Sequence, residues 1–170
     1  MSKMGACEEG AEKAVKKYIT ASPEETESLG AEVAVLLQAG DIVSLVGELG
    51  GGKTCFVRGF LKGLGQKGHV KSPSFNLLNI YDDDKDILPL YHMDLYRLTG
   101  EGDFFEAGLE EYIYSGGISV IEWADKVPAI LENSAVVVRF IYLGESRREI
   151  SVQKRGSGRG LDGGGAAGSL

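Results

Sequence analysis

The chain has 170 residues, 43% of them hydrophobic and 25% charged, which fits one globular domain and excludes a disordered or fibrous protein. The formal net charge is −7, and the first 153 residues hold 15 basic and 24 acidic side chains, a net of −9. An acidic body of this kind argues against an extensive surface for nucleic acid.

Residues 1–21 read as an N-terminal extension that is partly helical, with a short helix expected over Ala11–Tyr18. The first strong pattern follows it: Ser22 caps a helix, Pro23 takes its first position and Glu25 completes a capping box. Apolar residues then recur at helical spacing, and a glycine at position 40 is placed to end the helix. These apolar residues are Leu29, Val33, Leu36 and Leu37.

A strand, a glycine-rich loop and a helix come next. Ile42–Val46 is short, β-branched and almost entirely apolar, which is typical of a buried strand in a parallel sheet. The loop covers Gly47–Gly52, and Lys53–Leu64 is predicted to be a helix with one apolar face.

An antiparallel hairpin is predicted after this helix. Its strands are Phe75–Tyr81 and Ile87–Arg97, joined by a solvated acidic turn. Phe104–Tyr114 is predicted to be helical, with Gly108 as a break.

The last part of the domain is predicted to be mostly strands. Ile118–Ile121 is a second buried strand that ends at Glu122, and Ala135–Tyr142 and Arg148–Val152 form two late strands. Residues 22–153 are therefore predicted to form an α/β domain of the P-loop NTPase fold, with three layers and a mixed sheet that has a parallel core. Residues 154–170 include seven glycines and are predicted to be a disordered tail.

The cysteines and the apolar stretches indicate a compartment. Cys7 and Cys55 are the only cysteines, so neither a disulfide framework nor a zinc site is expected. No stretch is long and apolar enough to span a bilayer, and the first ten residues lack the apolar segment of a secretory signal. We expect a cytoplasmic protein without membrane association.

The segment from Gly47 to Thr54 reads GELGGGKT and fits the phosphate-binding pattern G-x-x-x-x-G-K-[ST]. Glycines let successive N–H groups face one anion, and the following helix adds its partial positive charge. In such a loop Lys53 reaches the β- and γ-phosphates and the Thr54 hydroxyl ligates Mg²⁺. A chance match in a chain of this length occurs on the order of once in a hundred. The flanking strand and helix therefore favour a site for ATP and Mg²⁺. Its expected binding residues are Gly47, Glu48, Leu49, Gly50, Gly51, Gly52, Lys53, Thr54 and Cys55.

A phosphate-binding loop also needs an acidic group near the metal, usually at the end of a neighbouring buried strand. Glu122 is the best-placed candidate, and Asp94, which interrupts an apolar strand, is the next. Either one is equally compatible with an ordinary solvated or paired carboxylate. His92 can form a metal site with Asp94, although alternating polar residues in a strand usually mark one satisfied polar face. Trp123 fits core packing and Cys55 a buried thiol.

Taken together, these segments resemble the TsaE family (older name YjeE), the ATPase of bacterial tRNA threonylcarbamoyladenosine synthesis. The match is ordered and runs over roughly Ser22 to Val152. Gly40–Phe60 looks like the family's P-loop strand and helix, and Val70–Phe75 like its switch segment. Leu90–Leu98 looks like its H-x-D-x-Y-R strand, and Ile121–Trp123 like its modified Walker B ending.

The resemblance implies a role for each motif. Asp94 would serve hydrolysis near the γ-phosphate, Ser72–Phe75 would respond to the nucleotide state, and the segment around Thr26 would lie by the adenine. The implied catalytic residues are Asp94, Lys53 and Glu122, and the implied Mg²⁺ ligands are Thr54, Glu122 and Asp94.

The resemblance also implies partners. Family members act with TsaB and TsaD, where TsaD transfers a threonylcarbamoyl group to adenosine 37 of tRNA and TsaE supplies ATP turnover. The chain would thus be an ATP hydrolase that is weak alone and meets tRNA only through the complex. It departs from the family at Glu48, where Asp is usual, and at Gly51, where Ala is usual. The first departure leaves the role of residue 48 open.

Three other functions are possible for a nucleotide-binding fold of this kind. A GTP-driven switch would want an Asn-Lys-x-Asp motif, which Ala124–Val127 does not fit. A small-molecule kinase would need an arginine-bearing lid, for which the chain after Glu122 offers only Arg139 and Arg147–Arg148. A nucleotide-dependent interaction module that does not turn ATP over is also compatible with the sequence, because hydrolysis can require the partner's surface to complete the site.

Overall fold

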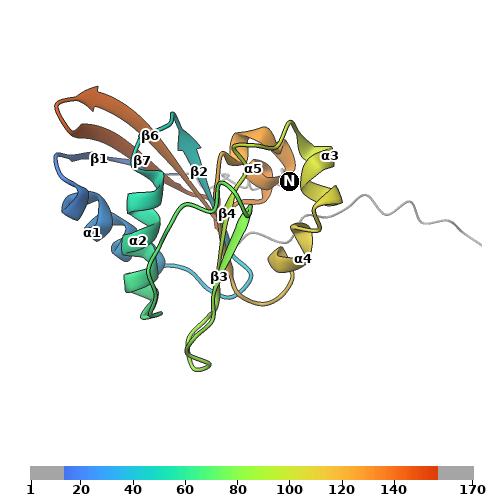
Figure 1. The fold of residues 1–170 in the computed structure, drawn as a ribbon. Coiled ribbons are helices and arrows are strands. Elements are labelled where there is room, and N and C mark those ends of the chain that lie inside the picture. The colour runs from blue at the N-terminus through green and yellow to red at the C-terminus, as the bar shows by residue number, and fades with distance from the viewer. Residues whose placement is uncertain (1–13, 157–170) are drawn as a thin grey trace, which may run out of the picture.

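A computed structural model describes residues 14–156, which form a mixed seven-stranded sheet with helices on both faces (Figure 1). The strands are β1 (Val15–Thr20), β2 (Ile42–Gly47), β3 (Leu78–Tyr81), β4 (Leu90–Asp94), β5 (Ile118–Glu122), β6 (Val136–Gly144) and β7 (Arg147–Lys154). The helices are α1 (Pro23–Ala34), α2 (Lys53–Leu64), α3 (Glu101–Glu106), α4 (Glu110–Ile113) and α5 (Pro128–Asn133), and Ala124–Lys126 forms a short 3-10 helix, η1.

The strand order is β1-β7-β6-β2-β5-β4-β3. The four central strands β6, β2, β5 and β4 run parallel, whereas β1, β7 and β3 pair antiparallel with their neighbours. The register places Asp94 of β4 opposite Glu122 of β5. The predicted mixed sheet with a parallel core is confirmed, and both candidate carboxylates lie at the carboxyl edge of that core.

Helices α1 and α2 cover one face of the sheet, and α3, α4 and α5 cover the other (Figure 1). Each face has its own buried cluster. The first cluster joins the two long helices to the sheet through Leu29, Phe56, Phe60, Val43 and Val138. The second joins the short helices to it through Phe104, Ile113, Ile130, Met93 and Ile121. The three predicted layers are therefore present.

Helices α1 and α2 pack closely because glycines lie between them. A Cβ built on Gly59 would lie 1.8 Å from the Glu27 carbonyl oxygen, which no real Cβ tolerates. The Glu27 carboxylate also accepts hydrogen bonds from Arg58 at 2.9 Å and Lys62 at 2.6 Å. These bonds hold the pKa of Glu27 below its usual value, with the Lys62 bond the larger cause. Close backbone contact and one ion-pair cluster thus fix α2, which begins at the glycine-rich loop.

The N-terminal part differs from the prediction. The expected helix over Ala11–Tyr18 is wrong for residues 15–18, which belong to strand β1; residues 11–13 lie outside the described part. Pairing with β7 decides the outcome, because it lets Tyr18 pack against the core while Ile19 on the other side of the strand stays 52% exposed. The sheet therefore begins at Val15, ahead of the predicted domain boundary at residue 22.

Four other boundaries also shift. Strand β3 starts at Leu78 rather than at residue 75, because a turn in which the Leu77 N–H donates to Pro73 O (2.7 Å) precedes it. Strand β4 covers only five of the residues predicted between 87 and 97. Helix α1 ends before Leu36, which is 56% exposed and does not join the apolar stripe. At the other end β7 includes Lys154, so the predicted disordered tail does not begin there; residues 157–170 lie outside the described part.

The remaining predicted elements are confirmed. Serine 22 caps α1 by accepting a hydrogen bond from the Glu25 N–H at 3.2 Å. The helix over Lys53–Leu64, the hairpin β3–β4, the two late strands β6 and β7, and the break at Gly108 are all present; β6 and β7 pair with each other as a second hairpin. No helix within residues 14–156 has the length and apolarity that crossing a bilayer requires.

Candidate nucleotide-binding site

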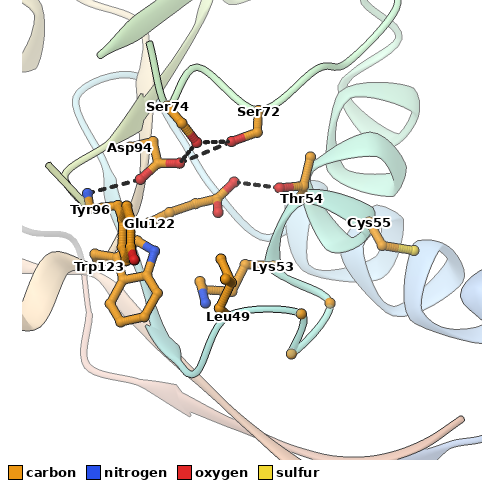
Figure 2. A pocket seen from close by; sticks show the side chains of 13 residues that line it. Leu49, Lys53, Thr54, Cys55, Ser72, Ser74, Asp94, Tyr96, Glu122 and Trp123 are labelled. Carbon is orange, nitrogen blue, oxygen red and sulfur yellow. Dashed lines mark hydrogen bonds between the residues drawn. The ribbon is translucent and has the colours of Figure 1, made fainter. Parts of the chain in front are cut away.

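The carboxyl ends of β2, β4 and β5 meet the first turn of α2 at one edge of the sheet, and a cleft of about 370 Å³ opens there (Figure 2). It brings most of the predicted site residues together. The lining residues are Leu49, Gly50, Gly51, Gly52, Lys53, Thr54, Cys55, Ser72, Ser74, Asp94, Tyr96, Glu122 and Trp123.

The glycine-rich loop links β2 to α2, as the sequence predicted. Gly52, the residue before α2, has φ of +102°, in the left-handed region that a side chain strains. A Cβ there would also lie 3.0 Å from Arg148 Nε. Leu49, at the loop's tip, is 77% exposed, and Glu48 is exposed as well. The loop's backbone therefore forms one wall of the cleft.

Lys53 is almost fully buried, with 4% of its surface exposed. Its Nζ donates to the carbonyl oxygens of Gly47 (2.7 Å) and Glu48 (2.8 Å) and lies 4.3 Å from the centre of the Trp123 ring. Burial lowers the pKa of Lys53, and the nearby Glu122 carboxylate is the largest of the effects that oppose the shift. The loop's cation is thus folded back on the loop itself.

Thr54 and Glu122 meet across the cleft. The Thr54 hydroxyl donates to Glu122 Oε1 at 3.1 Å, and Glu122 is 3% exposed. His92 Nε2 is 2.7 Å from the same oxygen, so His92 pairs with Glu122 and not with Asp94. A buried carboxylate is stable only when donors surround it, and these two supply that need.

Asp94 is held on both of its oxygens. Oδ2 accepts hydrogen bonds from the hydroxyls of Ser72 (2.9 Å) and Ser74 (2.8 Å), and Oδ1 accepts one from the Tyr96 N–H at 2.9 Å (Figure 2). Asp94 is only 3% exposed. The predicted switch segment is therefore tied directly to the predicted hydrolytic carboxylate.

Trp123 belongs to the cleft, where the sequence suggested only core packing. Its φ of +59° is unusual for a residue with a bulky side chain and costs about 1–3 kcal/mol. The conformation is held by a hydrogen bond from its N–H to Leu45 O (3.0 Å) and by the Tyr96 ring, 5.1 Å away. Its place directly after Glu122 was the signal that could have revealed it.

A smaller cavity lies on the other side of the loop. It has a volume of about 170 Å³ and is lined by Pro23, Thr26, Gly52, Cys55, Arg58 and Arg148. The hydroxyl of Thr26 is paired with that of Thr20 at 2.9 Å, and Thr26 is 1% exposed. Any contact of Thr26 with a nucleotide would therefore use atoms other than its hydroxyl. The sequence offered Arg148 only as a possible lid arginine of a kinase, and no pattern indicated its contact with the glycine-rich loop.

Cys55 differs from the expected buried thiol. It is partly exposed, its Sγ donates to Pro23 O at 3.2 Å, and partial burial raises its pKa. Figure 2 shows its side chain directed away from Glu122 and Asp94. Cys55 thus lies beside the nucleotide loop without joining the acidic group.

The side chains of the cleft fit a Mg²⁺ ion that is bound together with a nucleotide, rather than a metal ion held by protein groups alone. Among residues 14–156, no group of three or more His, Cys, Asp or Glu side chains is placed to hold a metal ion. Mg²⁺ in nucleotide sites is usually bound through one or two protein oxygens together with phosphates and water. The adjacent oxygens of Thr54 and Glu122 fit that arrangement.

A glycine-rich loop between a parallel strand and a helix, with carboxylates at the ends of neighbouring strands, defines the P-loop NTPase fold class. Within that class the chain belongs to the TsaE family. The model of the family "Threonylcarbamoyl adenosine biosynthesis protein TsaE" matches residues 20–150.

Individual relatives agree with the family match. A protein of Treponema pallidum named tRNA threonylcarbamoyladenosine biosynthesis protein TsaE is 41% identical over 136 residues, 80% of this chain and 98% of the relative. Its namesake in Bacillus subtilis is 38% identical over 135 residues, 79% of this chain and 83% of the relative. The crystal structure of Bacillus subtilis YdiB superimposes with a TM-score of 0.68 at 33% identity, covering 86% of this chain and 90% of that one.

Proposed function

We propose that this protein is a Mg²⁺-dependent ATPase that supports threonylcarbamoyl transfer to adenosine 37 of tRNA by a complex of TsaB- and TsaD-like proteins. The observation that carries the proposal is the phosphate-binding loop whose Thr54 hydroxyl lies 3.1 Å from Glu122. The family match and the relatives' names support the place in tRNA threonylcarbamoyladenosine biosynthesis.

The loop and its lysine would bind the phosphates of ATP. The backbone N–H groups of the loop and the N-terminus of α2 suit an anion. Lys53 Nζ would exchange the carbonyls of Gly47 and Glu48 for phosphate oxygens. That exchange suits a buried ammonium, because its present partners are neutral and a phosphate is charged.

Thr54 and Glu122 would hold Mg²⁺, which when bound neutralises charge on the β- and γ-phosphates. Asp94 would orient the attacking water and accept its proton. For that role it must release the hydroxyls of Ser72 and Ser74, which now occupy one of its oxygens. The switch segment therefore controls when Asp94 is free.

The hydrogen bonds of Asp94 favour a second candidate function, a nucleotide-dependent interaction module. With both oxygens of Asp94 satisfied by Ser72, Ser74 and the Tyr96 N–H, the chain alone does not present a free base. A partner that displaces the switch segment would complete the site. In the absence of such a partner, ATP binding would change the surface without turnover.

Phosphate release from Mg-ATP tests the proposal. It is measured for the protein alone, with TsaB, with TsaD and with both, using Lys53→Ala as the inactive control. We expect slow release alone and a clear rise only with both partners. Nucleotide-dependent binding to the pair with no release in any mixture would favour the interaction module. Failure to bind Mg-ATP would overturn both candidates.

A further inference from the structure

His92 lies in β4 with its side chain fully buried, at 0% exposure. Its Nε2 is 2.7 Å from Glu122 Oε1. A carboxylate accepts hydrogen bonds, so Nε2 is the donor and carries the proton. The Thr54 hydroxyl donates to the same oxygen from α2. One oxygen of Glu122 is therefore held from two sides, by the sheet and by the helix that follows the phosphate loop.

The other ring nitrogen of His92 indicates why a histidine is there. Nδ1 is buried and has no hydrogen-bond partner within the described residues. Burying a polar atom without a partner is unfavourable, because the atom loses its hydrogen bonds to water and gains none in return. A leucine or methionine would fill the same place without that cost. Packing therefore does not account for the histidine, whereas its bond to Glu122 does.

The strand register makes this bond specific. In the parallel pair β4–β5, His92 stands opposite Val120, and Asp94 stands opposite Glu122. His92 thus reaches Glu122 diagonally, from two residue pairs deeper in the sheet, while Asp94 faces the switch segment. Two polar residues that alternate in one strand serve two different parts of the cleft.

We infer that His92 is a positioning residue, which holds the Glu122 carboxylate beside the Thr54 hydroxyl so that the two oxygens present a ready pair to Mg²⁺. His92 is not itself a ligand, because its Nε2 is bonded to Glu122 and its Nδ1 is buried. The inference rests on the proposed Mg-ATP site. Removing a partner that orients a metal ligand typically costs 10–100-fold in metal affinity or activity, which sets the expected size of the effect.

The test compares His92→Leu, which removes the donor, with His92→Gln, which returns an N–H near the position of Nε2. ATP affinity is measured by calorimetry with EDTA and then over a series of Mg²⁺ concentrations, and thermal unfolding is followed in parallel. Met93→Leu, on the opposite face of the same strand, is the matched control. If His92→Leu does not fold, His92→Met replaces it, because a flexible thioether adapts to irregular space.

We expect no large change in the melting temperature of His92→Leu, because loss of the unpaired Nδ1 and loss of a donor to the buried Glu122 act in opposite directions. Its ATP affinity in EDTA should stay within about twofold, while its apparent Mg²⁺ affinity falls about tenfold and His92→Gln recovers most of the loss. An unchanged Mg²⁺ dependence, or an equal loss with and without Mg²⁺, would overturn the positioning role and leave the proposed function standing. Absence of Mg²⁺-dependent ATP binding in the wild-type protein would overturn both.

Discussion

The Nε of Arg148 donates a hydrogen bond of 3.1 Å to the carbonyl oxygen of Gly51, 97 residues earlier in the chain. A second donor of the same guanidinium, Nη1, bonds to Ser146 O at 2.9 Å, in the turn between β6 and β7. The phosphate-binding loop is thus held by a residue outside its own motif, in the β6–β7 hairpin, which is distant in the sequence but in direct contact with the loop.

Replacing this arginine should loosen the loop. Arg148→Met keeps much of the side chain's bulk but removes its donors, and we expect ATP affinity to fall about 3–10-fold, in line with the loss of a partly buried hydrogen bond. Arg147→Met, at the neighbouring exposed position, is the control. Calorimetry with Mg-ATP is the measurement, and equal affinity of the two variants would show that the contact does not organise the loop.

The buried lysine should matter most for nucleotide binding. Lys53→Ala removes the motif's side-chain cation, so we expect Mg-ATP affinity to fall by at least about tenfold, the scale of one lost hydrogen bond to a charged group. Lys85→Ala, at a side chain that is 80% exposed and paired with Asp82 on the surface, should bind like the wild type. Unchanged affinity and turnover in the Lys53 variant would contradict the proposed Mg-ATP site.

Replacing Glu122 and replacing Asp94 should impair different steps, metal-dependent binding in the first case and hydrolysis in the second. Glu122→Ala removes the oxygen that meets Thr54, so the gain in ATP affinity on adding Mg²⁺ should disappear. Asp94→Ala should keep Mg-ATP binding but lose phosphate release measured with both partner proteins. Glu106→Ala, on the exposed face of α3, controls for the loss of a surface charge. Wild-type turnover by both folded variants would mean that neither carboxylate belongs to the site.

A glycine on α2 offers a test of the helix pair. Alanine normally stabilises a helix relative to glycine by about 1 kcal/mol. At Gly59 the sign should reverse, because the added methyl would lie 1.8 Å from the Glu27 carbonyl oxygen, and we expect a loss of about 1–3 kcal/mol. Gly102→Ala in α3, where nothing lies within 4 Å, should be neutral or stabilising. Denaturant unfolding measures both; a Gly59 variant as stable as the wild type would contradict the close packing.

The nucleotide state should govern partner binding. Ser72 and Ser74 bond to Asp94 beside the phosphate loop, so ATP and ADP should place the switch segment differently. We expect the ATP-loaded protein to bind the TsaB–TsaD pair more tightly than the ADP-loaded protein. Binding should weaken as salt rises, because the body carries a large excess of acidic residues.

Size-exclusion chromatography over a salt series measures this binding, and filter binding measures affinity for tRNA. The chain alone should have no measurable affinity for tRNA at physiological salt. Tight tRNA binding by the isolated chain would contradict the proposal. So would the absence of binding between the chain and the TsaB–TsaD pair in every nucleotide state.

Much of the fold could be predicted because its strongest patterns are local. The strand before the glycine-rich loop, the helix after it and the two hairpins each have a periodicity or turn that short-range sequence determines. Strand β1 could not be predicted in that way. Its residues Val15–Thr20 include two lysines in succession, and the strand exists because it pairs with β7, as the bond from Lys17 to Glu149 across 132 residues illustrates.

The same division applies to the site. Lys53, Thr54 and Glu122 lie in motifs whose spacing reflects their chemistry, and the structure brings them into one cleft. The roles of His92 and Arg148 depend on strand register and on a contact between distant segments. A single sequence does not encode those relationships in any short pattern.

Trp123 is the only tryptophan in the chain, and its ring lies 4.3 Å from the Lys53 ammonium. All indole fluorescence of the protein therefore originates at the wall of the cleft. If Lys53 leaves the ring for a phosphate, the charge beside the indole changes and the emission should change with it. The unlabelled protein thus carries an optical reporter of its own occupancy, with a time resolution suited to following nucleotide entry and exit in a stopped-flow instrument.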